Sequence, residues 1–321
     1  MKWRKILRKI LLERIESVAI LGNIMLISLF VILTKGLWLS QIPGILTLAS
    51  QIGIITIGQA LLIISGEFDL SVSSVFAFIG MIFVFLNQAG LGTLLSFLCG
   101  LLVASIIGLI NGIITLKLKV PSLITTLGAL FIYRGLVYFF TGGFPLRLPM
   151  SVKDDTLIYV LGGNFLSNFN NAIIYLIFIT LMFVIILSYT KYGNHVVAVG
   201  GDPQTALSQG ISPVKIKMIA FIICSLLAGL SGIITTSING SVYASSGKGA
   251  ELETIAAAVI GGCSLRGGIG SIWGAVLGAV ILSSVRSGLI MIGAPPYWYI
   301  SFVGLTLIFF MAIIKIKERR E

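Results

Sequence analysis

The chain has 321 residues, of which 57% are hydrophobic and 10% are charged. Its mean hydropathy of +1.08 excludes an ordinary soluble globular domain. The formal net charge is +11 at pH 7, but the basic residues lie between apolar stretches and form no soluble basic face with stacking aromatics, which excludes a nucleic-acid-binding protein.

Long apolar stretches separated by Pro, Gly or charged residues run through the whole chain. Crossing a hydrocarbon core of about 30 Å takes about 20 residues of helix, whereas a β-barrel needs alternating strands of about ten residues. The pattern predicts an all-α integral membrane protein with about ten transmembrane helices, some short or broken. We expect these helices to begin near residues 17, 42, 68, 91, 121, 171, 213, 252, 271 and 296, those near 68 and 252 being short or broken.

Both ends of the chain are basic. Residues 1–16 form an arm rich in Lys and Arg, and the apolar stretch after it has no small-x-small cleavage site, so we expect a retained anchor. Residues 17–314 then form one transmembrane domain, and residues 315–321 form a basic tail. A cytoplasmic N-terminus places most Lys and Arg residues inside, as the positive-inside rule favours, so we place both termini in the cytoplasm.

Two segments place acidic residues just before a helix of small apolar residues. Glu67 and Asp69 stand in "GEFDLSVSS", and Glu251 and Glu253 stand in "GAELETIAAAVIGG". With about ten crossings, a repeat of five plus five helices must be inverted, which is a transporter arrangement with broken helices. We interpret the acids as helix-end residues, with Asp69 as an N-cap and Glu67 beside the positive helix end; direct contact with a passing substrate is the alternative.

Residues 191–215 form a long loop that we expect on the cytoplasmic side. Asp202 suits an N-cap, Pro203 suits the first helical position, and Gly210 suits a left-handed exit. The spacing therefore predicts one short helix over 203–209. Such a helix either receives a push from another protein or simply connects two spans.

Other residues have a structural interpretation. Arg134 lies inside an expected span, where an unpaired charge is costly, so we expect it to pair with a carbonyl or an acid. The small-residue run "GAVLGA" at 274–279 predicts close helix packing. The three cysteines have no paired spacing, and His195 is the one histidine, so the sequence indicates neither a disulfide framework nor a metal site. The outer loop 141–171 is a landing surface for an external protein or an exposed connector.

Four motifs, "GEFDLSVSS", "KVPSLITTLGALFIYRGLVYFFTGG", "AVGGDPQTALSQGIS" and "ELETIAAAVIGGCSLRGGIGSIWGAVLGA", occur in this order. They make residues 42–312 resemble the ribose-type permease subunits of ABC importers. The resemblance implies a bacterial inner-membrane permease paired with a second permease copy, mounted on a cytoplasmic ABC ATPase and supplied with a monosaccharide by an external solute-binding protein. It implies a coupling helix that docks into the ATPase and contains Asp202, Pro203, Gln204, Ala206, Leu207 and Gly210.

If the substrate is a sugar, we expect Ser, Thr and Asn side chains to meet its hydroxyls, and the candidates are Ser71, Ser73, Asn111 and Thr125. No G-x-x-x-x-G-K-[ST] motif occurs, so we expect a transporter subunit rather than an enzyme, with membrane lipid around it and no cofactor. The sugar is left open between a ribose-like pentose, a hexose and an autoinducer-2-like molecule. The alternatives are an ion-driven secondary transporter and an ABC permease for nucleosides or branched-chain amino acids.

Overall fold

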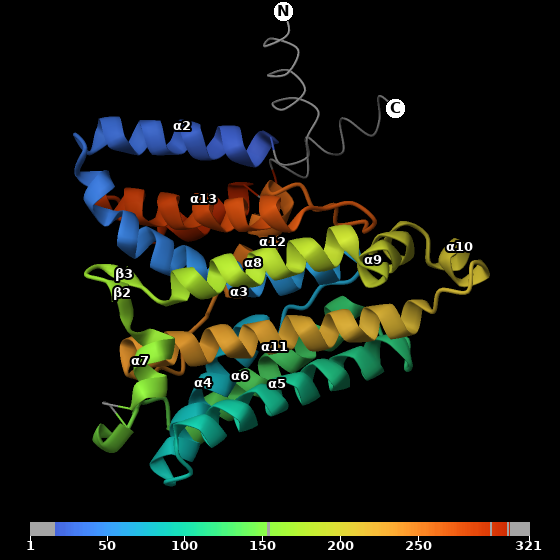
Figure 1. Cartoon of the computed structure of the whole chain (residues 1–321), viewed down its shortest axis with the longest axis horizontal. Helices are drawn as coiled ribbons and strands as arrows, with labels where there is room; N and C mark the ends of the chain where they lie inside the picture. The colour runs from blue at the N-terminus through green and yellow to red at the C-terminus, as the bar shows by residue number, and fades with distance from the viewer. Residues whose placement is uncertain (1–16, 153–154, 296, 307, 309–321) are drawn as a thin grey trace, which may run out of the picture.

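The computed structural model describes residues 17–152, 155–295, 297–306 and 308 (Figure 1). The predicted basic arm, 1–16, and the basic tail, 315–321, lie outside these residues. The elements are α2 (Ser17–Leu33), η1 (Leu37–Gln41), α3 (Ile42–Ile64), α4 (Val72–Gln88), α5 (Thr93–Leu116), α6 (Ser122–Thr141), β1 (Leu146–Arg147), η2 (Met150–Val152), α7 (Thr156–Gly162), β2 (Asn164–Leu166), β3 (Phe169–Asn170), α8 (Ala172–Tyr189), α9 (Lys191–Gly201), α10 (Pro203–Ser208), α11 (Pro213–Asn239), β4 (Ser241–Val242), α12 (Ala250–Ile260) and α13 (Ile272–Met291). Residues 298–306 are also helical.

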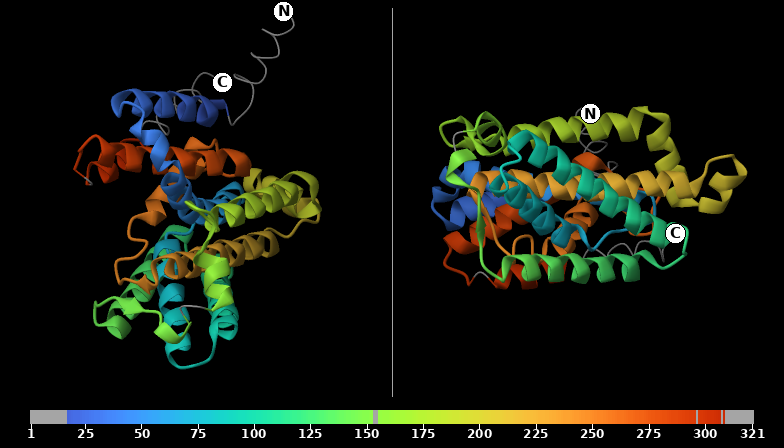
Figure 2. Two further views of the ribbon diagram at one scale, coloured as in Figure 1. Left: turned by 60° about the vertical axis from the view of Figure 1, so that its left-hand side comes forward. Right: turned by 90° about the horizontal axis from the view of Figure 1, so that it is seen from below.

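Two long helices, α3 and α11, pack against each other at the centre of the molecule (Figures 1 and 2). α4 and α5 pack against α11, whereas α12 and α13 pack against α3, and α2 covers α13. α3 occupies the centre because it is apolar on every side, and all of its residues from Gly53 to Ile64 are buried.

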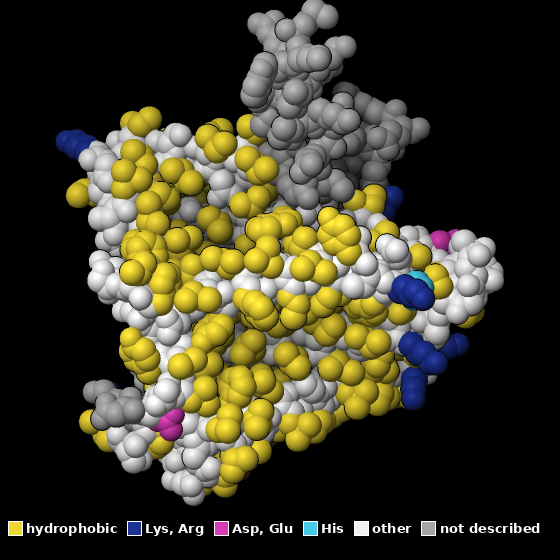
Figure 3. Space-filling model, viewed as in Figure 1, with side chains coloured by type: hydrophobic (Ala, Val, Ile, Leu, Met, Phe, Trp, Pro, Cys, Tyr) yellow, Lys and Arg dark blue, Asp and Glu magenta, His cyan; other side chains and the backbone are white. Residues whose placement is uncertain are grey.

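The outer helices present an apolar surface. Leu102 on α5, Phe131 on α6 and Phe178 on α8 are exposed. Figure 3 shows hydrophobic side chains over most of one face, with the charged side chains at its two ends, most of them at the end that carries α9 and α10. Water-soluble proteins rarely expose so large an apolar surface, which suits lipid contact instead. The chain is thus a multi-pass membrane protein.

Among the described residues, six helical segments are long and apolar enough to cross a membrane, namely Leu37–Ile64, Thr93–Leu116, Ser122–Thr141, Ala172–Tyr189, Pro213–Asn239 and Ile272–Met291. α2 and α4 are shorter apolar helices. α12 has only 11 residues and extends about 16 Å, well short of a 30 Å hydrocarbon core. The helices predicted to be short or broken are therefore α4 and α12, while the count of about ten crossings stays a prediction.

The run at 274–279 packs within this subunit. A Cβ atom at Gly278 would overlap the carbonyl oxygen of Ala257, and one at Gly274 would overlap that of Gly261, so only glycine allows α13 to lie this close to α12 and the turn after it. The predicted close helix packing is confirmed.

The structure is not purely helical. β1 pairs antiparallel with β4, and β2 pairs antiparallel with β3. These strands of two or three residues lie in the segments between helices, where an all-α prediction leaves only connectors. The mainly helical prediction is otherwise correct.

Candidate functional site

The chain between α3 and α4 leaves the helical path at residues 65–71 and brings a carboxylate into the interior. Asp69 is fully buried, and its Oδ1 accepts hydrogen bonds from the backbone N–H of Ser71 at 2.7 Å and from its hydroxyl at 2.6 Å. The Asn111 amide on α5 donates to Asp69 Oδ2 at 3.4 Å and to Ser71 Oγ at 3.0 Å. These donors offset the cost of burying the carboxylate.

The prediction that Asp69 is an N-cap residue is wrong by two positions. Helical geometry begins at Val72, so Ser71 is the N-cap residue of α4, and its side chain makes no capping bond. Asp69 instead fixes the turn before the helix by accepting from Ser71. On the other side of the turn the Gln59 amide lies against the Asp69 backbone. In the amide orientation that gives both of its polar atoms partners, Gln59 donates to the Asp69 carbonyl at 3.2 Å and accepts from the Asp69 N–H at 3.1 Å. The break is therefore held from α3 and α5 together.

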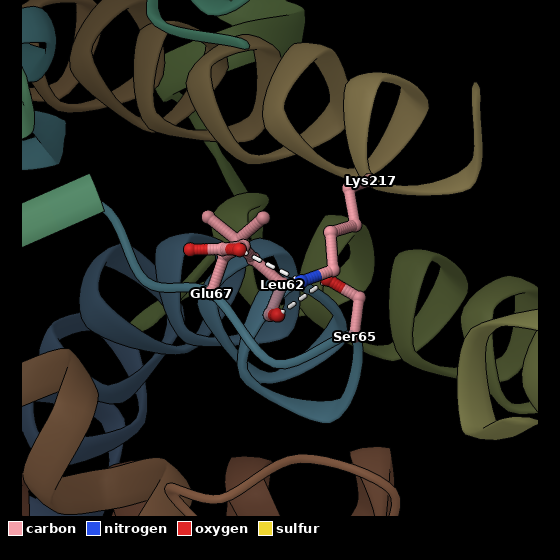
Figure 4. A network of polar contacts seen from close by, with 4 residues as sticks. All are labelled: Leu62, Ser65, Glu67 and Lys217. Atoms are coloured by element: carbon pink, nitrogen blue, oxygen red, sulfur yellow. Dashed lines mark hydrogen bonds and ion pairs between the residues drawn. The ribbon is translucent and has the colours of Figure 1, made fainter. Parts of the chain in front are cut away.

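The sequence suggested that Glu67 lies beside the positive end of a helix, whereas the structure pairs it with a lysine side chain. Its Oε1 lies 2.7 Å from Nζ of Lys217 on α11 (Figure 4), and the two side chains are 17% and 12% exposed. Ser65 next to it donates to the carbonyl oxygen of Leu62 at 2.7 Å. Little water reaches this ion pair, so salt screens it weakly, and it ties the α3 break to the beginning of α11.

Three segments meet at the end of α3 through their backbones. The N–H of Gly268 donates to the carbonyl oxygen of Ile64 at 2.8 Å. Gly200 on α9 lies against the same carbonyl so closely that a Cβ atom at Gly200 would overlap it. We call the contact of Ile64, Gly200 and Gly268 the glycine junction. It joins α9 directly to the membrane break.

α9 and α10 form a projection at one end of α11 (Figure 1). The sequence predicted one helix over 203–209, and α10 spans Pro203–Ser208. α9, which comes before it, was missed because Gly193, Gly200 and Gly201 lower its helix propensity. Thr190 caps α9 by accepting from the N–H of Gly193 at 3.2 Å.

The predicted ends of α10 are confirmed. Asp202 accepts from the backbone N–H groups of Gln204 at 2.9 Å and Thr205 at 3.2 Å, and Gly210 has the left-handed φ of 81°. Hydrogen bonds from the side chain and then the backbone of Thr205, together with that of Gln204, lower the pKa of Asp202. Ala206 is buried against the protein, whereas Leu207 is 61% exposed. α10 therefore presents an apolar side chain at the tip of a fixed projection.

Arg134 on α6 binds the second irregular segment, residues 240–249. Its guanidinium donates to the carbonyl oxygens of Ala244 at 2.7 Å and Ser246 at 2.8 Å, and to that of Ser73 on α4 at 3.0 Å. The expected pairing of Arg134 with a carbonyl is confirmed. The contact holds this segment against the start of α4.

The remaining predicted residues lie in separate places. Glu251 and Glu253 stand in the first turn of α12, as predicted; Glu251 accepts from the N–H of Gly249 at 3.1 Å, and Glu253 lies near enough to Arg286 for electrostatic attraction. Thr125 on α6 is buried, with no hydrogen-bond partner for its hydroxyl among the described residues. Hydrogen bonds thus join Asp69, Ser71 and Asn111. Among the described residues, none joins Thr125, Glu251 or Glu253 to that cluster.

Sequence reasoning did not single out Gln59 or Lys217. Gln59 is one of two amide side chains in the apolar helix α3, together with Gln51, and it is fully buried. The only signal in the sequence is that a polar side chain at membrane depth is costly unless it has a partner. Lys217 is one of many Lys and Arg residues that the positive-inside rule already explains, so the sequence gives no reason to expect a buried partner for it. Within the described residues no three His, Cys, Asp or Glu side chains are placed to hold a metal ion.

Comparison of the sequence with known proteins identifies its family. The family model described as "Branched-chain amino acid transport system / permease component" matches residues 41–311. The chain is 35% identical to the xylose/arabinose import permease protein XylH of Sulfolobus acidocaldarius, over 94% of this chain and 85% of that protein. It is 32% identical to the autoinducer 2 import system permease protein LsrC of Yersinia pseudotuberculosis, over 91% and 82%, and 31% identical to LsrC of Photorhabdus luminescens, over 94% and 89%. No solved structure matches.

Proposed function

The chain belongs to the branched-chain amino acid transport system / permease component family, and we propose that it is the permease subunit of an ABC importer for a monosaccharide. The similar relatives are permeases for xylose and arabinose and for autoinducer 2. Their identity and coverage support a pentose or another small furanosyl or pyranosyl sugar as the transported molecule.

The observation that carries this proposal is the projection formed by α9 and α10. Asp202 fixes the beginning of α10 and Gly210 its exit, while Leu207 is exposed at its tip. The glycine junction connects the base of this projection to the end of α3. A push on α10 by a cytoplasmic ATPase would therefore reach the membrane break without passing through a flexible linker. Asp202, Pro203, Gln204, Ala206, Leu207 and Gly210 form the proposed docking element.

We also propose a five-plus-five inverted repeat, which makes about ten crossings when the helix at 298–306 is included. α3 and α11 would be equivalent members of the two halves. The packing of α4 and α5 on α11, and of α12 and α13 on α3, supports this equivalence. Both termini, α9 and α10 would then lie in the cytoplasm of a cell whose inner membrane holds the protein.

The buried cluster of Asp69, Ser71 and Asn111 would act as the hinge of the break. Ser73 and Thr125 are also buried, so all of these polar groups would meet a sugar only when α4 moves. In this proposal the permease works with a second permease copy, a solute-binding protein outside and an ATPase that supplies the energy, without a cofactor of its own and without nucleic acid.

The test is co-purification with an ATPase. We would co-express the tagged chain with its genomic neighbours and compare Leu207→Asp with Leu166→Asp. These leucines are 61% and 60% exposed, and Leu166 lies on β2, far from the projection (Figure 1).

We expect the ATPase to co-purify with the wild type and with Leu166→Asp, and to be lost or uncoupled in Leu207→Asp, since a new charge would enter an apolar contact. A chain that binds no ATPase and moves solute on an ion gradient would instead be a secondary transporter, and the proposal would be wrong.

A further inference from the structure

A cavity of about 330 Å³ lies between α3, α4, α11, α12 and α13, beside residues 243–248. We propose that it is a binding site for a neutral, polyhydroxylated ligand on the outer side of the membrane, separate from the Asp69 cluster. The inference rests on the proposed function for the identity of the ligand, which is a monosaccharide. The volume is within the range of small-molecule pockets.

The elements that line the cavity place it at the end opposite the projection. Thr235 lies in the last turns of α11, which ends at Asn239, and Arg286 lies near the end of α13. Figure 1 shows α10 at one end of α11 and α7 at the other. With α10 in the cytoplasm, the cavity is on the outer side, where an external binding protein would deliver its ligand.

The lining has the two kinds of surface that a sugar needs. Ile52, Ile55 and Phe76 form an apolar wall for the C–H face of a ring. Gln51, Thr235, Tyr243 and Glu253 supply donors and acceptors around it. An amphipathic ring with hydroxyls on its edge fits such a lining better than a purely apolar solute does.

One polar group of the cavity lacks a protein partner. The hydroxyl of Thr235 is buried and makes no hydrogen bond to any described residue, although leaving a buried hydroxyl unpaired is costly. Gln51 adds an amide whose side chain makes no hydrogen bond within the described part of the chain. A ligand hydroxyl is the group that would satisfy both.

The charges of the site favour a neutral ligand. Glu253 and Arg286 both line the cavity and attract each other, and Arg286 also stacks on the ring of Tyr299 at 5.5 Å from its centroid. Lys248 also lines the cavity but is exposed to solvent, which screens its charge. Glu253 and Arg286 offset each other and act on a ligand as a paired acceptor and donor. An amino-acid zwitterion is the competing ligand, since it would match the same two charges.

The test is protection of an introduced cysteine in membrane vesicles. Ser245 lines the cavity and is exposed, so Ser245→Cys would be labelled from outside by an impermeant maleimide. The half-buried Cys99 is replaced by Ala, whereas Cys224 and Cys263 are buried and stay. Ser167→Cys, on the exposed turn between β2 and β3, is the matched control.

We expect D-xylose, L-arabinose or D-ribose at millimolar concentration to slow labelling of Ser245→Cys and to leave Ser167→Cys unchanged. At ten times its dissociation constant a ligand slows labelling about tenfold. Thr235→Val should weaken this protection about fivefold, because one hydrogen bond is lost. Thr47→Val is its control, since the Thr47 hydroxyl bonds to its own helix at Pro43 and should change nothing.

Labelling that no sugar slows, in a Ser245→Cys complex that still imports a pentose, would overturn the inference. Protection by L-leucine but by none of the sugars would also overturn it, in favour of a zwitterion site. The assay needs neither ATP nor an ATPase, so its failure is distinct from failure of co-purification, which would contradict the proposed function instead.

Discussion

The glycine junction makes a sharp prediction from two adjacent residues of one helix. In Gly200→Ala the new Cβ would overlap the carbonyl oxygen of Ile64 and lie 2.5 Å from the nitrogen of Gly268, whereas ordinary contacts begin at 3.4 Å. These two atoms and the carbonyl carbon of Ile64, at 2.9 Å, all belong to the backbone, so no flexible side chain can yield. In Gly201→Ala, one residue later, nothing lies within 4 Å of the Cβ.

The cost of Gly200→Ala follows from the contacts that must separate. Overpacking costs about 1 to 3 kcal/mol, and loss of the 2.8 Å bond from Gly268 to Ile64 leaves a buried donor unpaired, for another 1 kcal/mol or so. We expect about 3 kcal/mol in total, which corresponds to a drop of roughly 5 to 10 °C in melting midpoint. Gly201→Ala should change stability by less than about 0.5 kcal/mol.

The assay is thermal unfolding of both variants and the wild type in the same detergent, together with the amount of ATPase that co-purifies. Equal melting midpoints for Gly200→Ala and Gly201→Ala would refute the reasoning, because they would mean that α9 does not lie against the end of α3. A lowered midpoint in Gly201→Ala alone would refute it as well.

Three further predictions concern single contacts. Removing one partner of the Glu67–Lys217 ion pair, in Glu67→Gln or Lys217→Met, should lower the free energy of unfolding by about 2 to 3 kcal/mol. The double variant should recover part of this loss, and purely additive losses in unfolding measurements would contradict the contact. Asp202 has a folded-state pKa below its ordinary 3.8, so its contribution to α10 is complete at neutral pH and is lost only as the pH falls through that lowered value. Hydrogen exchange over residues 204–208, corrected for intrinsic rate, should show this acid loss in the wild type but not in Asp202→Asn, which keeps an N-cap without the titration. Arg134→Lys should increase hydrogen exchange over residues 243–249, since an ammonium cannot reach three carbonyls with the fixed geometry of a guanidinium, and unchanged exchange would argue against this clamp.

The sequence predicted those parts of the fold that depend on local composition. Apolar length identified the spanning helices, and the cap and exit residues Asp202 and Gly210 predicted α10 to within one residue. The shortness of α12 followed from the glycines and acids around it. The coupling role of α10, and the passage role of the polar residues, stay proposals.

What the sequence could not predict depends on contacts between distant segments. Glu67 and Lys217 are 150 residues apart, and nothing near either residue indicates its partner. α9 contains three glycines, which lower its intrinsic helix propensity. One of them, Gly200, is needed for the close contact with Ile64, so tertiary packing outweighs local propensity there. The register error at Asp69 has the same origin, since Gln59 and Asn111 extend the turn and delay the helix until Val72.

The pairing of β1 with β4 has a consequence for the rate at which the outer surface rearranges. Leu146 and Arg147 face Val242 and Ser241, and one further bond runs from the Leu148 N–H to the Gly240 carbonyl at 3.0 Å. A ladder this short is marginal, with each bond worth only about 1 kcal/mol. It will therefore separate and rejoin in microseconds to seconds while the helices on either side stay intact. The strand pair can open on its own, while Arg134 still holds Ala244 and Ser246 against the start of α4.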